Sequence, residues 1–341
     1  MPHGSFYFLL IILYLLVISY FFSAMKRLIT YLFLFLWVMA IGAQEIKNCV
    51  DAAQNIVPLQ DENGAVVEEH SLLTPHSSLL TKDVGLVLSG GGAFGFAHIG
   101  AIKALEEYGI EPAYVAGSSM GAIIGVMYAA GYSADDIMQI IKEERLYKVG
   151  RLITTQSTFR NEGFSTHKTL LRELAELVPH NSFDSLERKF MVCVTNVETG
   201  EADYQHEGSN LKEYVAASAS IPGAFEPIVI DSVRYVDGGV TDNLPVSQLL
   251  TLNPQLFIIG VDVLPFVENF EAKNSINMLL WMSRLFQSKN MDPNRAKCDW
   301  LIQSFALKEY HGFEFKRYKE IYQYGYDAMK AHIEAQLKKL K

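Results

Sequence analysis

Cysteine is scarce in this chain of 341 residues, which has only Cys49, Cys193 and Cys298. Three cysteines form no disulfide framework, so a small fold held together by disulfides is excluded. Cys49 and Cys298 could pair in an oxidising compartment, which would leave Cys193 buried in a strand over residues 190–195. Histidine, cysteine and acidic residues also never occur at metal-ligand spacing, so we expect no metal and no other cofactor.

Positive charge is also in short supply. Lys and Arg number 29 against 38 Asp and Glu, a net charge of −9. Without residues 1–43, which hold two basic residues and no acidic one, the balance is 27 against 38, or −11. This charge argues against nucleic acid as a partner and against a broad electrostatic attraction to anionic membranes. The chain also lacks repeats and low-complexity tracts, and 50% of it is apolar, so one sizeable core is expected.

Strand-like and helix-like stretches alternate along the chain. Ser133, followed by Asp135 and Asp136, is a typical start for one of the helices. The alternation favours an α/β fold with a largely parallel central sheet. Strands are predicted over residues 83–89, 111–116, 190–195 and 256–262, and helices over 97–108, 122–130, 134–144 and 168–177.

The first chemical signal is Ser119, in the sequence Gly-Ser-Ser-Met-Gly over residues 117–121. A predicted strand precedes it and a helix of small and apolar residues follows, which is the context that a Gly-x-Ser-x-Gly nucleophile elbow needs. The sharp bend would project the serine, and free N–H groups at the start of the helix favour a nearby negative charge. Ser119 is therefore the candidate nucleophile.

A glycine-rich loop lies upstream of Ser119. Residues 90–95 read Gly-Gly-Gly-Ala-Phe-Gly between a predicted strand and a predicted helix. Such a loop can aim consecutive N–H groups at a developing negative charge. The same glycines also match the G-x-G-x-x-G dinucleotide fingerprint. That alternative is weak, because the second strand leads into residues 117–119 and not into the acidic residue that would hold a ribose.

The third signal is an Asp-Gly-Gly sequence that begins at Asp237. By itself it is ordinary turn sequence. In this order, however, a Gly-rich loop, a Gly-x-Ser-x-Gly elbow and an Asp-Gly-Gly turn resemble the patatin-like phospholipases, a family of lipid acyl hydrolases. The resemblance runs from about residue 83 to residue 262 and includes the segment 216–227, and residues 321–328 are similar to a helix that closes many bacterial members.

The resemblance implies a patatin-like three-layer α/β/α fold and a serine lipid acyl hydrolase of the phospholipase or lysophospholipase type, in a bacterial, exported member of the family. Ser119 would be the nucleophile and Asp237 its general base, without a histidine. The N–H groups of Gly91 and Gly92 would hold the oxyanion. The family usually has Arg or Lys, thought to support the oxyanion loop, where this chain has Phe94. The other motif glycines are Gly90, Gly95, Gly117, Gly121, Gly238 and Gly239.

Two other functions stay open. A Ser-His-Asp esterase needs a histidine after the acid, and only His311 and His332 follow Asp237. Both are predicted to be solvated, and His98 is predicted to be a structural residue of the helix after the glycine loop. The other possibility is a catalytically weak lipid-binding protein that retains the fold, and Phe94 motivates it.

The amino terminus holds two apolar runs, residues 6–22 and 28–43, separated by Lys26 and Arg27. From Met25 onward, a charged start, an apolar stretch and small residues fit a signal peptide, so we expect export to the periplasm, the outer membrane or the medium. A protein anchored by one or two membrane spans is the alternative, because about 20 apolar residues suffice to span a bilayer.

The expected organisation is a signal or membrane segment over 1–43, a polar leader over 44–82, a catalytic domain over 83–265 and a helical extension over 266–341 that packs on it. An apolar segment around Trp281 would be either a core helix or a helix at a membrane surface. The expected partners are a lipid substrate and a membrane surface, and nothing in the sequence indicates an oligomeric state.

Overall fold

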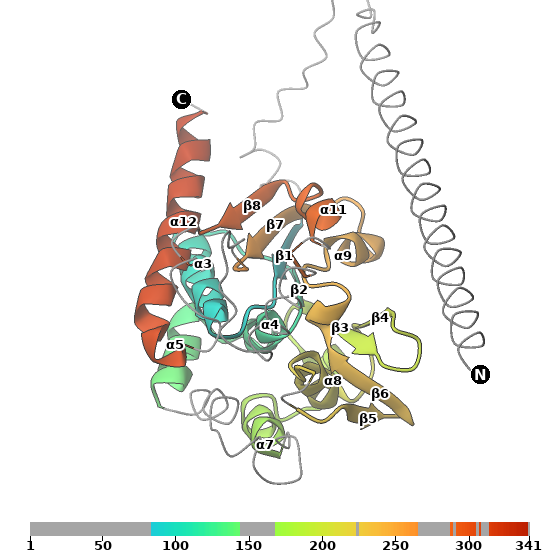
Figure 1. The fold of residues 1–341 in the computed structure, drawn as a ribbon. Coiled ribbons are helices and arrows are strands. Elements are labelled where there is room, and N and C mark those ends of the chain that lie inside the picture. Colours follow the sequence, from blue (N-terminus) through green and yellow to red (C-terminus); the bar gives the residue numbers. More distant parts are fainter. Residues whose placement is uncertain are drawn as a thin grey trace, which may run out of the picture. The chain divides into compact units, whose positions relative to one another are not determined.

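The computed structural model describes residues 83–143, 168–222, 225–264, 287–288, 291–304, 307 and 314–339. All of them belong to one compact unit, Leu72–Lys341 (Figure 1). Several sequence predictions lie outside the described residues: the signal segment 1–43, the leader 44–82, Cys49, the helix around Trp281, and His311. Cys193 and Cys298 are both free thiols.

One mixed sheet organises this unit. Its strand order is β5-β6-β3-β2-β1-β7-β8, with β4 paired to β3 beside that path. The strands β3, β2, β1, β7 and β8 run parallel to their neighbours. At the other end of the sheet, β4 and β6 pair antiparallel with β3, and β5 pairs antiparallel with β6. The strands are β1 (Val84–Leu88), β2 (Tyr114–Gly117), β3 (Lys189–Asn196), β4 (Ala202–Gln205), β5 (Ile228–Ile230), β6 (Val233–Asp237), β7 (Phe257–Asp262) and β8 (Trp300–Gln303).

Helices connect and cover the strands. The start of α5 has the predicted cap, in which the side chains of Ser133 and Asp136 each accept from the other residue's N–H group. Among the described residues, no helix has both the length and the hydropathy that a membrane span requires. The helices are α3 (Phe96–Glu107), α4 (Met120–Ala129), α5 (Ala134–Lys142), α7 (Lys168–Leu177), α8 (Leu211–Ser218), α9 (Val246–Leu252), α11 (Asp292–Arg295) and α12 (Tyr318–Lys338).

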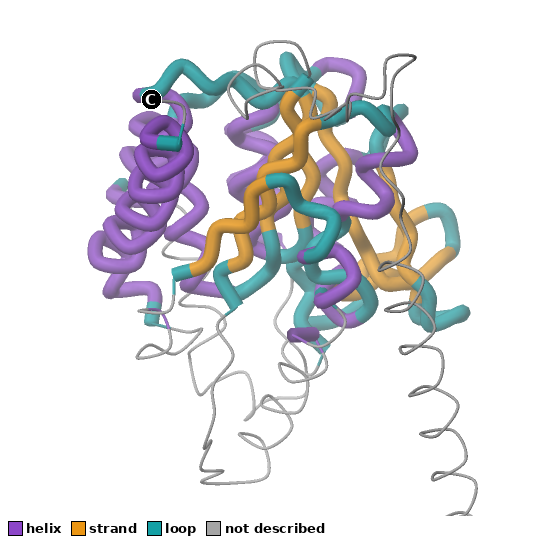
Figure 2. The backbone as a smooth tube through the Cα atoms, turned by 90° about the horizontal axis from the view of Figure 1, so that it is seen from above, coloured by secondary structure: helices purple, strands orange, loops and turns teal. Residues whose placement is uncertain are grey.

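Alternating side chains give the sheet two apolar faces. In β1, Leu86 and Leu88 pack into the larger cluster, with residues of α3, α4, α8 and α12, whereas Val87 packs into the smaller cluster with residues of α9. β7 repeats the pattern, with Ile259 on the larger side and Ile258 on the smaller side. Strands covered on both faces read as continuous apolar runs, which explains their sequences. Figure 2 shows helices on both sides of the strands.

The predicted α/β fold with a largely parallel sheet is confirmed. The four predicted strands correspond to β1, β2, β3 and β7, and the four predicted helices to α3, α4, α5 and α7. The prediction of a helical extension over residues 266–341 needs correction, because this region also contains a strand. β8 pairs in parallel with β7 and widens the sheet. In β8 only Trp300 and Ile302 are buried, and so short a pattern does not distinguish a strand from a helix.

Candidate active site

Ser119 occupies the turn between β2 and α4. Its φ of 51° and ψ of −123° lie in a region that residues with a side chain rarely adopt. Two neighbours stabilise this backbone: the Ser119 N–H donates to Ser218 Oγ at 2.9 Å, and Ser118 Oγ donates to the carbonyl of Asp242 at 2.7 Å. The side chain therefore projects from a fixed, strained bend, as the elbow sequence predicts.

Asp237 lies directly beside Ser119. Ser119 Oγ donates to Asp237 Oδ2 at 2.6 Å, and Asp237 Oδ1 accepts from the N–H of Gly239 at 2.8 Å. The sheet explains this proximity, because β6 ends at Asp237 opposite Val194 of β3, and β3 lies beside β2. Only 7% of Ser119 and 4% of Asp237 is exposed, so both side chains are largely shielded from water.

Burial raises the pKa of Asp237 from 3.8 to about 6. The hydrogen bonds from Ser119 and from the Gly239 N–H act in the opposite direction, because both favour the carboxylate. The group remains ionised at neutral pH. A carboxylate with this pKa is a stronger base than an ordinary one, which suits proton abstraction from an alcohol.

The glycine-rich loop leads from β1 into α3 through a short 3-10 turn over Gly92–Gly95. The N–H group of Gly90 is bonded to Asn243, whereas those of Gly91 and Gly92 have no hydrogen-bond partner among the described residues. Gly91 and Gly92 are also partly exposed, while their neighbours on both sides are buried. Gly92 has a φ of 58°, which favours glycine. The loop thus presents two free, partly exposed donors.

The loop and the elbow are in contact. A Cβ atom on Gly90 would lie 2.9 Å from Ser119 Cβ, which is closer than real Cβ contacts. The other motif glycines are equally confined by neighbouring atoms: Met120 at Gly95, Gly121 at Gly117, Leu88 at Gly121, Cys193 at Gly238, and Asn243 at Gly239. The structure therefore brings all three motifs together at one edge of the sheet.

Among the described residues, no histidine forms a hydrogen bond with Ser119 or Asp237. His332, predicted to be solvated, is instead half-buried, with its ring centroid 5.1 Å from that of Trp300, and burial lowers its pKa. His98 is fully buried and bonded through Nε2 to the carbonyl of Ser89 at 2.7 Å. Burial lowers the His98 pKa to about 4, so the ring is neutral. Its Nδ1 has no partner in the described part, so the predicted structural histidine is only half-satisfied.

Two residues that support the site were missed by the sequence analysis. Ser218, the last residue of α8, accepts from Ser119 N–H and donates to the carbonyl of Cys193 at 2.7 Å. Asn243 contacts Gly90 through both ends of its amide. Ser218 lies at the end of α8 and Asn243 shortly after the Asp-Gly-Gly turn. Their partners, Ser119 and Gly90, are 99 and 153 residues away, and no local pattern reveals such contacts.

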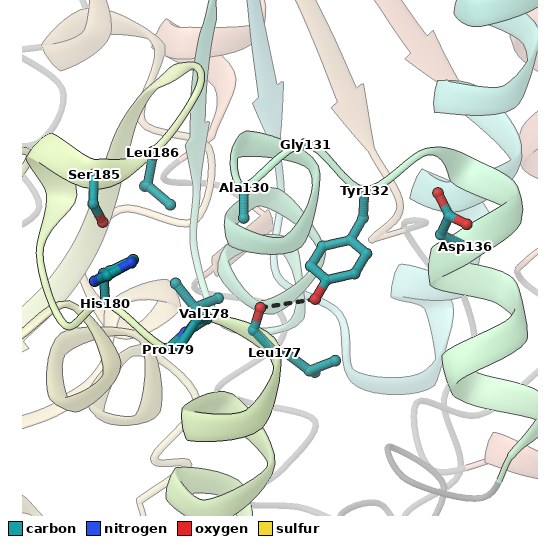
Figure 3. A pocket seen from close by; sticks show the side chains of 10 residues that line it. All are labelled: Ala130, Gly131, Tyr132, Asp136, Leu177, Val178, Pro179, His180, Ser185 and Leu186. Carbon is teal, nitrogen blue, oxygen red and sulfur yellow. Dashed lines mark hydrogen bonds between the residues drawn. The ribbon is translucent and has the colours of Figure 1, made fainter.

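A separate pocket of about 470 Å³ lies beyond the C-terminal end of α4, whose other end carries Ser119. It contains the side-chain types of a hydrolase triad, but Asp136 lies across the pocket from His180 and Ser185 (Figure 3). The Asp136 carboxylate also accepts from Ser133. No triad is therefore assembled there. The lining comprises Ala130, Gly131, Tyr132, Asp136, Leu177, Val178, Pro179, His180, Ser185 and Leu186.

Fold and site together define an α/β protein with a buried Ser–Asp pair beside a loop of free N–H donors. Residues 86–250, which contain all three motifs, match the family described as patatin-like phospholipase. The chain thus carries a patatin-like phospholipase domain, as the motifs indicate.

Similar proteins include two lysophospholipases. Lysophospholipase NTE1 of Meyerozyma guilliermondii is 25% identical over 77% of this chain and 20% of its own length. Lysophospholipase nte1 of Emericella nidulans is 34% identical over 54% of this chain and 12% of its own length. The chain therefore spans a fifth or less of these relatives. Among solved structures, VipD from Legionella pneumophila has 15% identity and a TM-score of 0.46, over 75% of this chain and 67% of VipD.

Proposed function

We propose that this chain is a serine lipid acyl hydrolase, of the phospholipase or lysophospholipase type, that uses a Ser119–Asp237 dyad. The observation that carries the proposal is the 2.6 Å hydrogen bond between Ser119 Oγ and Asp237 Oδ2 at a strained, nearly buried elbow. The patatin-like domain and the similarity to two lysophospholipases support the substrate class.

In the proposed reaction, Ser119 Oγ attacks the carbonyl carbon of a lipid carboxyl ester while its proton passes to Asp237 Oδ2. The N–H groups of Gly91 and Gly92 stabilise the resulting oxyanion. Collapse of the tetrahedral intermediate expels the alcohol, which takes the proton from Asp237. A water molecule then loses a proton to Asp237, attacks acyl-Ser119 and releases the fatty acid, and Asp237 returns its proton to Ser119.

The test is hydrolysis of p-nitrophenyl esters and of mixed-phospholipid vesicles by the wild type, Ser119→Ala and Asp237→Asn. We expect fatty acid release by the wild type only. Turnover that survives Asp237→Asn would instead support a histidine-based esterase. A folded wild type that binds vesicles without turnover would favour the lipid-binding protein, for which the buried Phe94 in place of a cation is the motivating observation.

We also propose that the protein is exported and that it belongs to a bacterial branch of the family. The apolar run after Lys26 and Arg27, and the similarity of residues 321–328 to bacterial members, support this proposal. The segment around Trp281 is the proposed contact with a membrane surface. Cell fractionation with N-terminal sequencing tests export: a mature chain that begins after Ala43 is expected, and an uncleaved chain in the membrane fraction would support the anchored alternative.

A further inference from the structure

The peptide groups of the glycine loop are held by side chains from two other parts of the fold. Asn243 Oδ1 accepts from the Gly90 N–H at 3.1 Å, and Asn243 Nδ2 donates to the Gly90 carbonyl at 3.3 Å. From the other direction, His98 Nε2 lies 2.7 Å from the carbonyl of Ser89. A carbonyl oxygen only accepts, so this nitrogen carries the proton of the neutral ring. Both peptide groups that flank Gly90 are therefore fixed.

These bonds determine where the first oxyanion donor points. The Gly90 carbonyl and the Gly91 N–H belong to one planar, trans peptide group, so they point in opposite directions. When Asn243 Nδ2 holds that carbonyl, it also directs the Gly91 N–H away from Asn243. A carbonyl that accepts a hydrogen bond polarises its peptide group, which strengthens the N–H as a donor.

Asn243 also lies against the turn that carries the proposed base. A Cβ atom on Gly90 or on Gly239 would collide with Asn243 Oδ1, so that one oxygen fits closely between the two loops. The Gly239 N–H bonds Asp237 Oδ1, and the turn therefore has a fixed position relative to the carboxylate. One amide thus sets the spacing between the oxyanion donors and the dyad.

The side chains in these contacts are uncharged. Asn243 is an amide, and burial keeps His98 neutral by lowering its pKa to about 4. Phe94 is 1% exposed, and it lies beside Gly91. The loop is therefore supported by neutral hydrogen bonds in a buried setting, where such bonds are strong.

We propose that Asn243 and His98 are positioning residues that orient the Gly91 N–H for the oxyanion. The proposal rests on the proposed function, because it requires a tetrahedral intermediate at Ser119. A misplacement of 1 Å at such a site costs on the order of 100-fold in rate.

Asn243→Ala and Asn243→Asp test the proposal in the full-length protein. The aspartate keeps the shape and the acceptor but, when ionised, cannot donate to the Gly90 carbonyl. With a p-nitrophenyl ester we expect kcat to fall on the order of 100-fold, with KM within about twofold of the wild type. The rate of Ser119 labelling by a fluorophosphonate falls similarly, while the final extent of labelling stays complete. The matched control is Asn181→Ala, whose amide bonds the Lys212 N–H and Glu213, and whose kcat is expected to match the wild type.

A second pair of variants makes the test independent of the folding of Asn243→Ala. His98→Gln retains an N–H donor and His98→Leu does not. We expect His98→Leu to lose about tenfold or more in kcat and His98→Gln to recover most of it. Equal kcat in Asn243→Ala and the wild type, or equal loss in Asn181→Ala, would overturn the proposal, as would equal rates in the two His98 variants. A wild type that neither hydrolyses the ester nor reacts with the fluorophosphonate refutes the proposed function itself.

Discussion

Asp237→Asn is expected to stabilise the folded protein at neutral pH while it abolishes activity. Burial raises the pKa of Asp237 from 3.8 to about 6, so the folded state holds a proton on this group that the unfolded state has already released between these pH values. Stability is therefore lost as pH rises through that window, and the full cost of keeping a buried carboxylate ionised is present above about 6. Two pKa units correspond to ~3 kcal/mol.

Asparagine does not ionise, and its side-chain oxygen can still accept from the Gly239 N–H. The difference in unfolding free energy between the variant and the wild type is therefore expected to grow with pH. Between pH ~4 and pH ~7 it shifts by ~3 kcal/mol in favour of the variant. Urea denaturation at pH 4, 5, 6, 7 and 8 measures it, and groups that titrate alike in both proteins cancel.

Ser119→Ala is the companion variant, because it removes the nucleophile and keeps the carboxylate. The Ser119 hydroxyl lowers the pKa of Asp237, so its loss raises that pKa further and extends the decline of stability to higher pH. A difference between Asp237→Asn and the wild type that does not change from pH 4 to pH 8 would refute the reasoning. One such result is an Asp237→Asn protein that is less stable than the wild type by the same margin at pH 4 and at pH 8.

Three further outcomes are expected. First, kcat/KM falls about tenfold per pH unit below pH ~6, because Asp237 then takes up the proton that it must accept; ester hydrolysis from pH 4.5 to 8 measures this. Second, Gly92→Ala lowers kcat at least tenfold by straining a φ of 58°. Gly200→Ala, with a φ of 74° and no atom within 4 Å of the added Cβ, leaves kcat unchanged; a loss in both would contradict the loop's role. Third, Ser218→Ala leaves the buried Ser119 N–H unpaired and costs ~2 kcal/mol of unfolding free energy in urea; no measurable change would show that this bond does not stabilise the elbow.

The parts of the site that could be predicted are those with a local signature. Ser119 and Asp237 each occur in a short motif whose turn requires small neighbours, and the order of the motifs identifies the family. Four strands of the parallel part of the sheet, β1, β2, β3 and β7, could be located because burial on both faces makes them continuous apolar runs.

The contacts between distant segments could not be predicted. Asn243 lies 153 residues from Gly90, and only the folded sheet places the two loops side by side. His332, on a helix rich in charged residues, gave no sign that it would pack on Trp300, because that tryptophan belongs to a strand the sequence did not reveal. The pKa of Asp237 depends on burial, which is a property of the fold and not of the motif.

The most direct test of the Ser119–Asp237 assignment is to locate the residue that a fluorophosphonate modifies. Peptide mapping by mass spectrometry of the labelled wild type is expected to find one modification, on Ser119, that a competing lysophospholipid prevents. A folded Asp237→Asn protein should remain unlabelled over the same time. Modification of a different residue, or labelling of Asp237→Asn at the wild-type rate, would contradict the account.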